Sequence, residues 1–118
     1  MTFTIKRIYD KPAADDGYRV LVDRLWPRGV SKGAADLDEW LKDVAPSPDL
    51  RVWFDHDPAR FAEFTTRYDA ELVGSPAVDA LRERGDGDAK VTLLYGAKDP
   101  AINHAVVLRE FLLRPQEE

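Results

Sequence analysis

Two short polar segments of this sequence carry the residue types that bind and transform small molecules. The first comprises residues 23–28, Asp-Arg-Leu-Trp-Pro-Arg, and follows directly on an apolar run of strand character. Charged groups at the end of a buried strand lie where α/β sheets hold their ligands. Arg24 and Arg28 are suited to binding a carboxylate or a phosphate, and Trp26 can supply an apolar wall. Asp23 is the candidate for proton transfer, although it can equally tie the loop by pairing with a neighbouring arginine.

Strand geometry decides which of these side chains can face a pocket. If the strand persists to Asp23 and Arg24, the two side chains point to opposite faces of the sheet, and only one of them needs to line the pocket. Arg28 and Trp26 follow in the loop, where a proline and a glycine pre-set the backbone. We therefore expect Arg28 and Trp26 to contribute more to binding than Arg24.

The second polar segment comprises residues 95–104, Tyr-Gly-Ala-Lys-Asp-Pro-Ala-Ile-Asn-His. A tight turn from a strand into a helix leaves backbone amides free, and the helix dipole favours an anion there. His104 can act as an acid, a base or a hydrogen-bond donor, and the alternative is that it packs against the sheet while Asp99 merely caps the helix. The candidate residues of this segment are Tyr95, Gly96, Lys98, Asn103 and His104.

The residue types argue against several other kinds of site. The chain has two histidines and no cysteine, and no ligand spacing predicts a metal site. Each serine that could serve as a nucleophile has a capping or turn explanation, and the glycine patterns of phosphate and dinucleotide loops are absent. We expect neither a metal nor a cofactor.

Three stretches have strand character, and they differ in how polar their faces are. Residues 3–9 alternate apolar and polar side chains, whereas residues 18–23 and 91–95 are apolar on both faces, as in central strands of an α/β sheet. The connection between the first two strands is too short for an ordinary crossover helix. Whether those two strands pair directly stays open.

Short polar side chains followed by proline predict where helices begin. Ser47, Asp57, Ser75 and Asp99 each precede a proline, which favours a capped first turn, and Asp36 resembles a fifth cap. Apolar side chains at helical spacing predict helices over residues 37–44, 61–72, about 77–81 and 100–113. Residues 113–118 are expected to fray. The order of elements predicts an α/β fold with a small, at least partly parallel sheet flanked by helices.

Composition sets the broad class of the protein. The 118 residues are 44% hydrophobic and 33% charged, which is ordinary for a single globular domain spanning residues 1–118. The net charge of −5 makes nucleic acid an unfavourable partner, although the basic residues between Arg19 and Lys32 could form a local patch. No run is long and apolar enough to span a membrane, and no signal peptide is present, so we expect a cytoplasmic protein.

The first polar segment belongs to a longer pattern that resembles the DUF488 family, in its YeaO-like branch. The similarity covers residues 18–32, 39–47, 64–72, 91–95 and 103–105, and the run from Asp23 to Gly29 is highly specific. The resemblance implies a compact α/β domain of unknown function with polar residues at its strand ends. Other DUF488 branches carry a cysteine in the segment equivalent to residues 95–97. This chain has none, so neither thiol chemistry nor the sulfur transfer of the more loosely similar rhodanese domains is available to it.

These observations favour one function over two others. The first hypothesis is that the protein binds an anionic small molecule that carries a phosphate or carboxylate, with a nucleotide as one candidate, in a cleft between the two polar segments. Asp23 or His104 would then carry any proton transfer, while Arg24, Arg28 and Lys98 hold the anion. The alternatives are a non-catalytic regulatory or interaction domain, and, less favoured, a nucleic-acid-binding protein. A homodimer is the default expectation for assembly.

Overall fold

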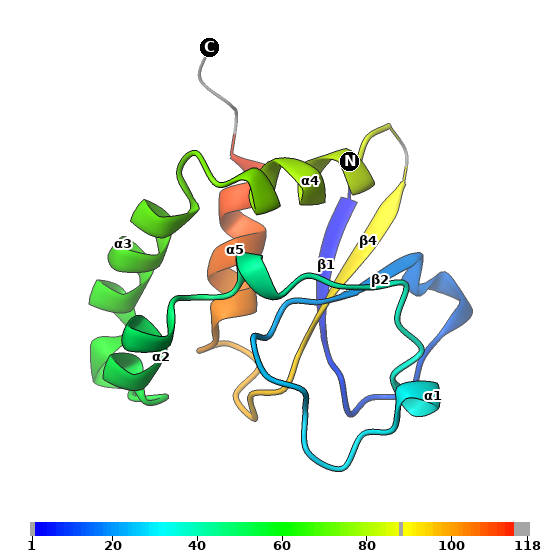
Figure 1. Ribbon diagram of the computed structural model, residues 1–118, viewed down its shortest axis with the longest axis horizontal. Coiled ribbons are helices and arrows are strands. Elements are labelled where there is room, and N and C mark those ends of the chain that lie inside the picture. The colour runs from blue at the N-terminus through cyan, green and yellow to red at the C-terminus, as the bar shows by residue number, and fades with distance from the viewer. Residues whose placement is uncertain (1, 88, 115–118) are drawn as a thin grey trace.

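A parallel sheet forms the centre of the protein in the computed structural model, which describes residues 2–87 and 89–114. Its strands are β1 (Thr2–Arg7), β2 (Tyr18–Leu21), β3 (Glu39–Trp40) and β4 (Lys90–Tyr95), arranged in the order β1-β4-β2-β3 (Figure 1). All three pairs of neighbouring strands are parallel. The first two strands therefore do not pair with each other, because β4 lies between them. The α/β class and the parallel sheet predicted from the sequence are confirmed.

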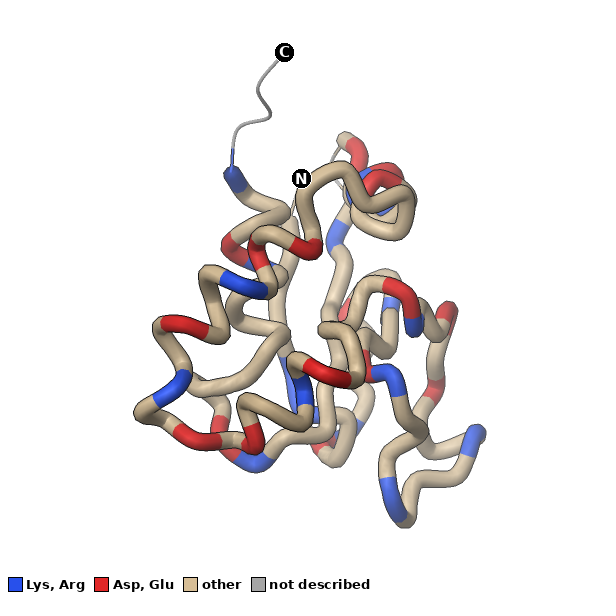
Figure 2. The backbone as a smooth tube through the Cα atoms, turned by 60° about the vertical axis from the view of Figure 1, so that its left-hand side comes forward, with Lys and Arg blue, Asp and Glu red and all other residues tan. Residues whose placement is uncertain are grey.

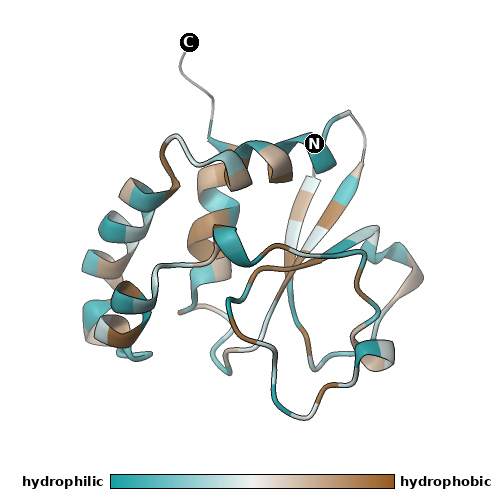
Figure 3. Cartoon of the chain, viewed as in Figure 1, coloured by the Kyte–Doolittle hydropathy of each residue, from teal (hydrophilic) through white to brown (hydrophobic). Residues whose placement is uncertain are grey.

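Helices cover one face of this sheet. They are α2 (Pro48–Phe54), α3 (Phe61–Leu72), α4 (Pro76–Arg84) and α5 (His104–Leu113). Helix α5 packs on β1 and β4, and α3 packs on the outer side of α5. Apolar side chains of β2 and β4 meet those of α5 in the main core, and Figure 3 shows mainly polar residues on the outer turns of α3. None of the helices in the described residues is long and apolar enough to cross a membrane.

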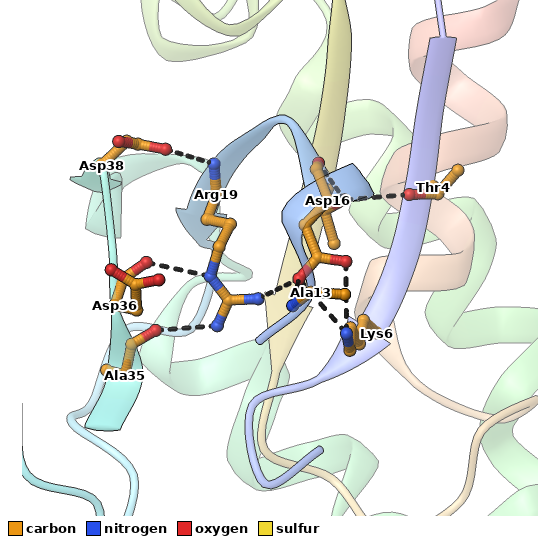
Figure 4. Close-up of polar contacts among 9 residues, drawn as sticks. Thr4, Lys6, Ala13, Asp16, Arg19, Ala35, Asp36 and Asp38 are labelled. Atoms are coloured by element: carbon orange, nitrogen blue, oxygen red, sulfur yellow. Dashed lines mark hydrogen bonds and ion pairs between the residues drawn. The ribbon is translucent and has the colours of Figure 1, made fainter. Parts of the chain in front are cut away.

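The opposite face is covered mainly by loops and by the one-turn helix α1 (Lys32–Ala35). A small apolar cluster lies there, in which Leu21 and Leu94 of the sheet contact Trp26 and Trp40. Beside it lies a polar cluster centred on Arg19, whose side chain is 4% exposed (Figure 4). The Arg19 guanidinium donates to the Asp16 carboxylate at 2.5 Å and to the carbonyl of Ala35 at 2.7 Å. Apart from the one-turn α1, the α-helices of the described residues therefore lie on one face of the sheet.

The helix predicted over residues 37–44 is wrong. Residues 39–40 form β3, and the turn of 3-10 helix Lys42–Val44 follows it. The amides of Asp38 and Leu41 donate to carbonyls of β2, at 2.9 Å each, so this segment bonds to the sheet instead of to itself. Its apolar side chains serve two cores: Trp40 packs on the loop-covered face, and Val44 packs on the helix-covered face. Spacing that fits one helical stripe fits this arrangement as well.

The predicted helix starts are partly confirmed. Ser47 and Ser75 cap α2 and α4, whereas Asp57 caps the short 3-10 helix Pro58–Arg60 that leads into α3. Asp36 is no N-cap: it ends α1 with a φ of 49°. The predicted start of the last helix is also wrong, because the Asp99 carboxylate accepts from two amides of a turn and α5 begins five residues later.

The first two strands and the C-terminal tail have other bounds than the sequence predicts. Strand β1 ends at Arg7 instead of residue 9, and β2 ends at Leu21 instead of residue 23. Of the tail predicted over residues 113–118, Leu113 is still the last residue of α5. Residues 115–118 lie outside the described residues.

Candidate functional site

A cleft of about 270 Å³ opens beyond the carboxyl ends of β1, β2 and β4. Since the strands run parallel, these ends meet at one edge of the sheet, which is where open α/β sheets hold their ligands. Both polar segments of the sequence contribute to its lining, and α2 closes another side. Among the residues predicted for the site, the lining includes Asp23, Arg24, Trp26, Gly96, Asn103 and His104.

Asp23 connects the two polar segments. One carboxylate oxygen, Oδ2, accepts a hydrogen bond of 2.9 Å from the Gly96 amide. A Cβ atom on residue 96 would lie 3.0 Å from this oxygen, so glycine permits the contact. The turn amide that the sequence suggested for a ligand is therefore occupied by a carboxylate of the protein itself.

His104 lies beside the other oxygen of Asp23. Its Nε2 atom is 3.0 Å from the Val22 carbonyl oxygen and 3.0 Å from Asp23 Oδ1. Both neighbours are acceptors, so a neutral His104 carries its proton on Nε2 and keeps Nδ1 as an acceptor. The single N–H bonds to the Val22 carbonyl, which leaves the buried Asp23 Oδ1 close to the imidazole but without a hydrogen bond from any residue that the structure describes. Asp23 and His104 thus form a close acid–base pair in the cleft.

Arg24 lines the same cleft as Asp23. Its guanidinium donates to the carbonyls of Ala45 and Pro46, at 3.3 Å each. The expectation that these two neighbours point apart required the strand to reach them, but β2 ends at Leu21. Alternation between the faces of a sheet no longer holds beyond that point.

Three of the predicted site residues lie away from the cleft. Arg28 is exposed at the tip of its loop, where its carbonyl accepts from the Tyr9 hydroxyl at 3.0 Å. Lys98 is exposed in the turn after β4. Tyr95 is 2% exposed in the main core, and burial raises the pKa of its phenol. Their neighbours in sequence, and not these residues themselves, line the cleft.

The remaining predicted residues have structural partners. Trp26 lines the cleft, donates from Nε1 to the Val30 carbonyl at 2.7 Å, and meets Trp40 edge to face at 5.2 Å. Asn103 is buried; its Oδ1 caps α5 by accepting from the Val106 amide, and its Nδ2 donates to the Asp99 carbonyl. Trp26 is therefore held as a fixed apolar wall of the cleft.

Sequence reasoning missed the contribution of α2 and of the residues that follow it. Arg51, Phe54 and His56 all line the cleft. Phe54 stacks on Phe64 with ring centroids 4.1 Å apart, which adds an aromatic wall. The sequence marks this region only by its cap at Ser47, and nothing local in it indicates that α2 faces the ends of the strands.

The cleft has unequal charges. Among the residues that the structure describes, neither Arg24 nor Arg51 pairs with a carboxylate. Asp23, the acidic residue of the lining, already accepts from a backbone amide and lies against His104. Among the described residues, the unpaired positive charge of the cleft lining therefore exceeds its unpaired negative charge.

Comparison with known proteins gives one family and a few relatives. A family model described as "Inactive DUF488-N3 subclade" matches residues 2–118. The uncharacterized protein Rv3073c of Mycobacterium tuberculosis (strain H37Rv) is 44% identical over 108 residues, covering 92% of this chain and 91% of that protein. The uncharacterized protein YeaO of Escherichia coli (strain K12) is 42% identical over 117 residues, covering 95% of this chain and 97% of that protein. No solved structure matches the chain.

Proposed function

The chain belongs to the inactive DUF488-N3 subclade, and on that premise we propose that it is a binding protein whose cleft holds a small anionic molecule. The description "inactive" and the absence of cysteine from the whole sequence both favour binding over covalent catalysis. The ligand carries a phosphate or a carboxylate. The observation that carries the proposal is the pair of guanidinium groups, Arg24 and Arg51, that line one cleft without a carboxylate partner among the described residues.

Arg24 is prepared for this role by its surroundings. Two backbone carbonyls fix the Nε and Nη2 edge of the guanidinium, and Nη1 makes no hydrogen bond within the described part of the chain. A guanidinium held in one orientation loses little entropy when it binds an anion. Arg51, by contrast, is exposed on α2 and contributes a more mobile charge.

The walls and the size of the cleft narrow the class of ligand. Trp26, Phe54 and Phe64 supply aromatic surface, which suits a flat apolar group attached to the anion. A volume of about 270 Å³ lies just under the range of clefts that hold drug-sized molecules. The cleft therefore favours a small aromatic phosphate ester or carboxylate over a dinucleotide.

The acid–base pair of Asp23 and His104 adds one further property. A carboxylate beside an imidazole that keeps Nδ1 free can accept and return a proton. We assign any proton transfer in this cleft to these two residues. In the binding function proposed here, their role is to hold the turn after β4 against the loop after β2.

The placement of the basic residues gives less support to nucleic-acid binding. That function would need the basic stretch from Arg19 to Lys32 on one exposed face, whereas Arg19 is buried with Asp16 and Arg24 lies in the cleft. Figure 2 shows Lys and Arg interspersed with Asp and Glu along the described chain. A continuous basic surface, which is the footprint of a nucleic-acid-binding protein, is not formed by these residues.

Calorimetric titration with phenyl phosphate and with benzoate tests the proposal. We expect the wild-type protein to bind at least one of them, and Arg24→Ala and Arg51→Ala to weaken binding by about tenfold or more, because each removes a charge-assisted hydrogen bond. Arg24 also holds two carbonyls of the protein, so the melting temperature of its variant is measured alongside.

Arg28→Ala is the matched control, since it removes the same charge from a residue outside the cleft. It should bind like the wild type. If neither compound binds at millimolar concentration, or if Arg28→Ala loses as much affinity as the cleft variants, the proposal is wrong. Failure of all anions to bind would favour an interaction domain without a small-molecule ligand.

A further inference from the structure

The backbone after α2 takes an unusual path at His56. Asp55 and His56 are consecutive residues with positive φ, of 48° and 53°. Asp55 has a local reason for this conformation, because it ends α2 and its amide donates to the Arg51 carbonyl at 3.1 Å. His56 has no such capping role. Glycine adopts a left-handed backbone without strain, and asparagine, aspartate and histidine tolerate it better than other residues, so the turn alone would still favour glycine at position 56.

The side chain of His56 gives a reason for the strain. It lines the cleft, as Arg51 does, and its ring centroid is 6.2 Å from that of Phe54. Among the described residues, the imidazole makes no hydrogen bond and no ion pair, and the residue is exposed. The fold therefore holds a polar ring at the rim of the cleft without using its nitrogen atoms.

We infer that His56 is a specificity-determining residue of the cleft, which donates a hydrogen bond to a phosphate group held by Arg24 and Arg51. This inference rests on the function proposed above and names its ligand more closely. A terminal phosphate offers three peripheral oxygens, and the three side chains offer one donor group for each. A carboxylate has two oxygens, which the arginines alone can satisfy. His56 thus biases the cleft toward phosphate monoesters over carboxylates.

The test compares two ligands in three proteins. His56→Asn keeps a residue that tolerates the left-handed turn but removes the imidazole, and Asp55→Asn changes the neighbouring left-handed residue, which does not line the cleft. For His56→Asn we expect affinity for phenyl phosphate to fall by about fivefold or more and affinity for benzoate to change by less than about twofold. Asp55→Asn should leave both affinities as in the wild type.

The outcomes separate this inference from the proposed function. If the wild type binds phenyl phosphate and His56→Asn binds it equally well, or loses both ligands equally, the inference is overturned while the proposed function stands. If the wild type binds neither compound, both are overturned. A second variant, His56→Gly, checks whether the imidazole serves the fold: its melting temperature should equal or exceed that of the wild type, and a clear decrease would contradict the inference.

Discussion

Asp23 brings a negative charge into a cleft that we propose binds an anion. Its carboxylate accepts from the Gly96 amide and touches His104, so the charge serves contacts within the protein. Asparagine keeps an oxygen for the Gly96 amide and removes the charge. Asp23→Asn therefore tests the effect of this charge on binding while the shape of the side chain stays nearly the same.

We expect Asp23→Asn to tighten the binding of phenyl phosphate by about two- to fivefold, because it removes repulsion between like charges across a solvated cleft. The dissociation constant from calorimetry, at low and at moderate ionic strength, measures this effect. The control is Asp86→Asn, which removes the same charge from an exposed turn between α4 and β4. Weaker binding in the Asp23 variant would show that the carboxylate supports the ligand through His104.

Part of the candidate site could be predicted at the residue scale. Asp23, Gly96 and His104 could be placed at one sheet edge because each follows an apolar strand or the turn after one, and parallel strands end together. Arg51 and His56 could not, because their position depends on how α2 packs. Nothing in a local pattern states which face of a short helix turns toward a cleft.

Helix α5 depends on a cap that the sequence pattern did not single out. Asn103 caps this helix, is 1% exposed, and also donates to the Asp99 carbonyl. We expect Asn103→Ala to lower the free energy of unfolding by about 1–2 kcal/mol, since it removes a cap and leaves the Asp99 carbonyl without this donor. Thermal unfolding followed by circular dichroism measures the loss.

Ser31→Ala is the comparison for this element. Ser31 caps α1, which is only one turn long, and its hydrogen bond to the Ala34 amide is exposed. Its loss should shift the melting temperature much less. Equal shifts of the melting temperature in the two variants would mean that burial of the Asn103 cap contributes nothing to the stability of the protein.

Elements were predictable where a local signal and the packing agree. Ser47 and Ser75 caps, and the apolar stripe of α3, identify three helices because those helices lie on one face of the sheet. The helix predicted over residues 37–44 is wrong because the apolar side chains of this segment divide between two cores on opposite faces of the sheet. Asp99 and Asn103 are both residue types that cap a helix N-terminus. The packing of α5 on the sheet decides that the helix begins after Asn103.

The molecule as a whole carries a buried ionic cluster on its loop-covered face. Burial raises the pKa of Asp16, but hydrogen bonds from the Ala13 amide, Lys6 and Arg19 outweigh it and leave the pKa below its usual value of 3.8. The unfolded chain therefore takes up this proton first as the pH falls. The stability from this group is present above the unfolded-state pKa and is lost as the pH falls through the lower, folded-state value.

We expect Asp16→Asn to be less stable than the wild type at pH 7 and to lose less stability than the wild type on acidification below about pH 4. Urea unfolding at a series of pH values gives both results. The exposed neighbour variant Asp15→Asn should follow the wild type. If the Asp16 variant shows the same acid dependence as the wild type, the cluster does not govern acid stability.

The position of β4 has a consequence for how this chain is made. β4 is hydrogen-bonded to both β1 and β2, yet among the strands of the described residues it is the last to be synthesised. Until residues 90–95 have left the ribosome, β1 has no partner strand and β2 has only the two-residue β3. The nascent chain therefore carries open strand edges from β1 and β2 until β4 is made, and the sheet closes only after residues 90–95 have been synthesised.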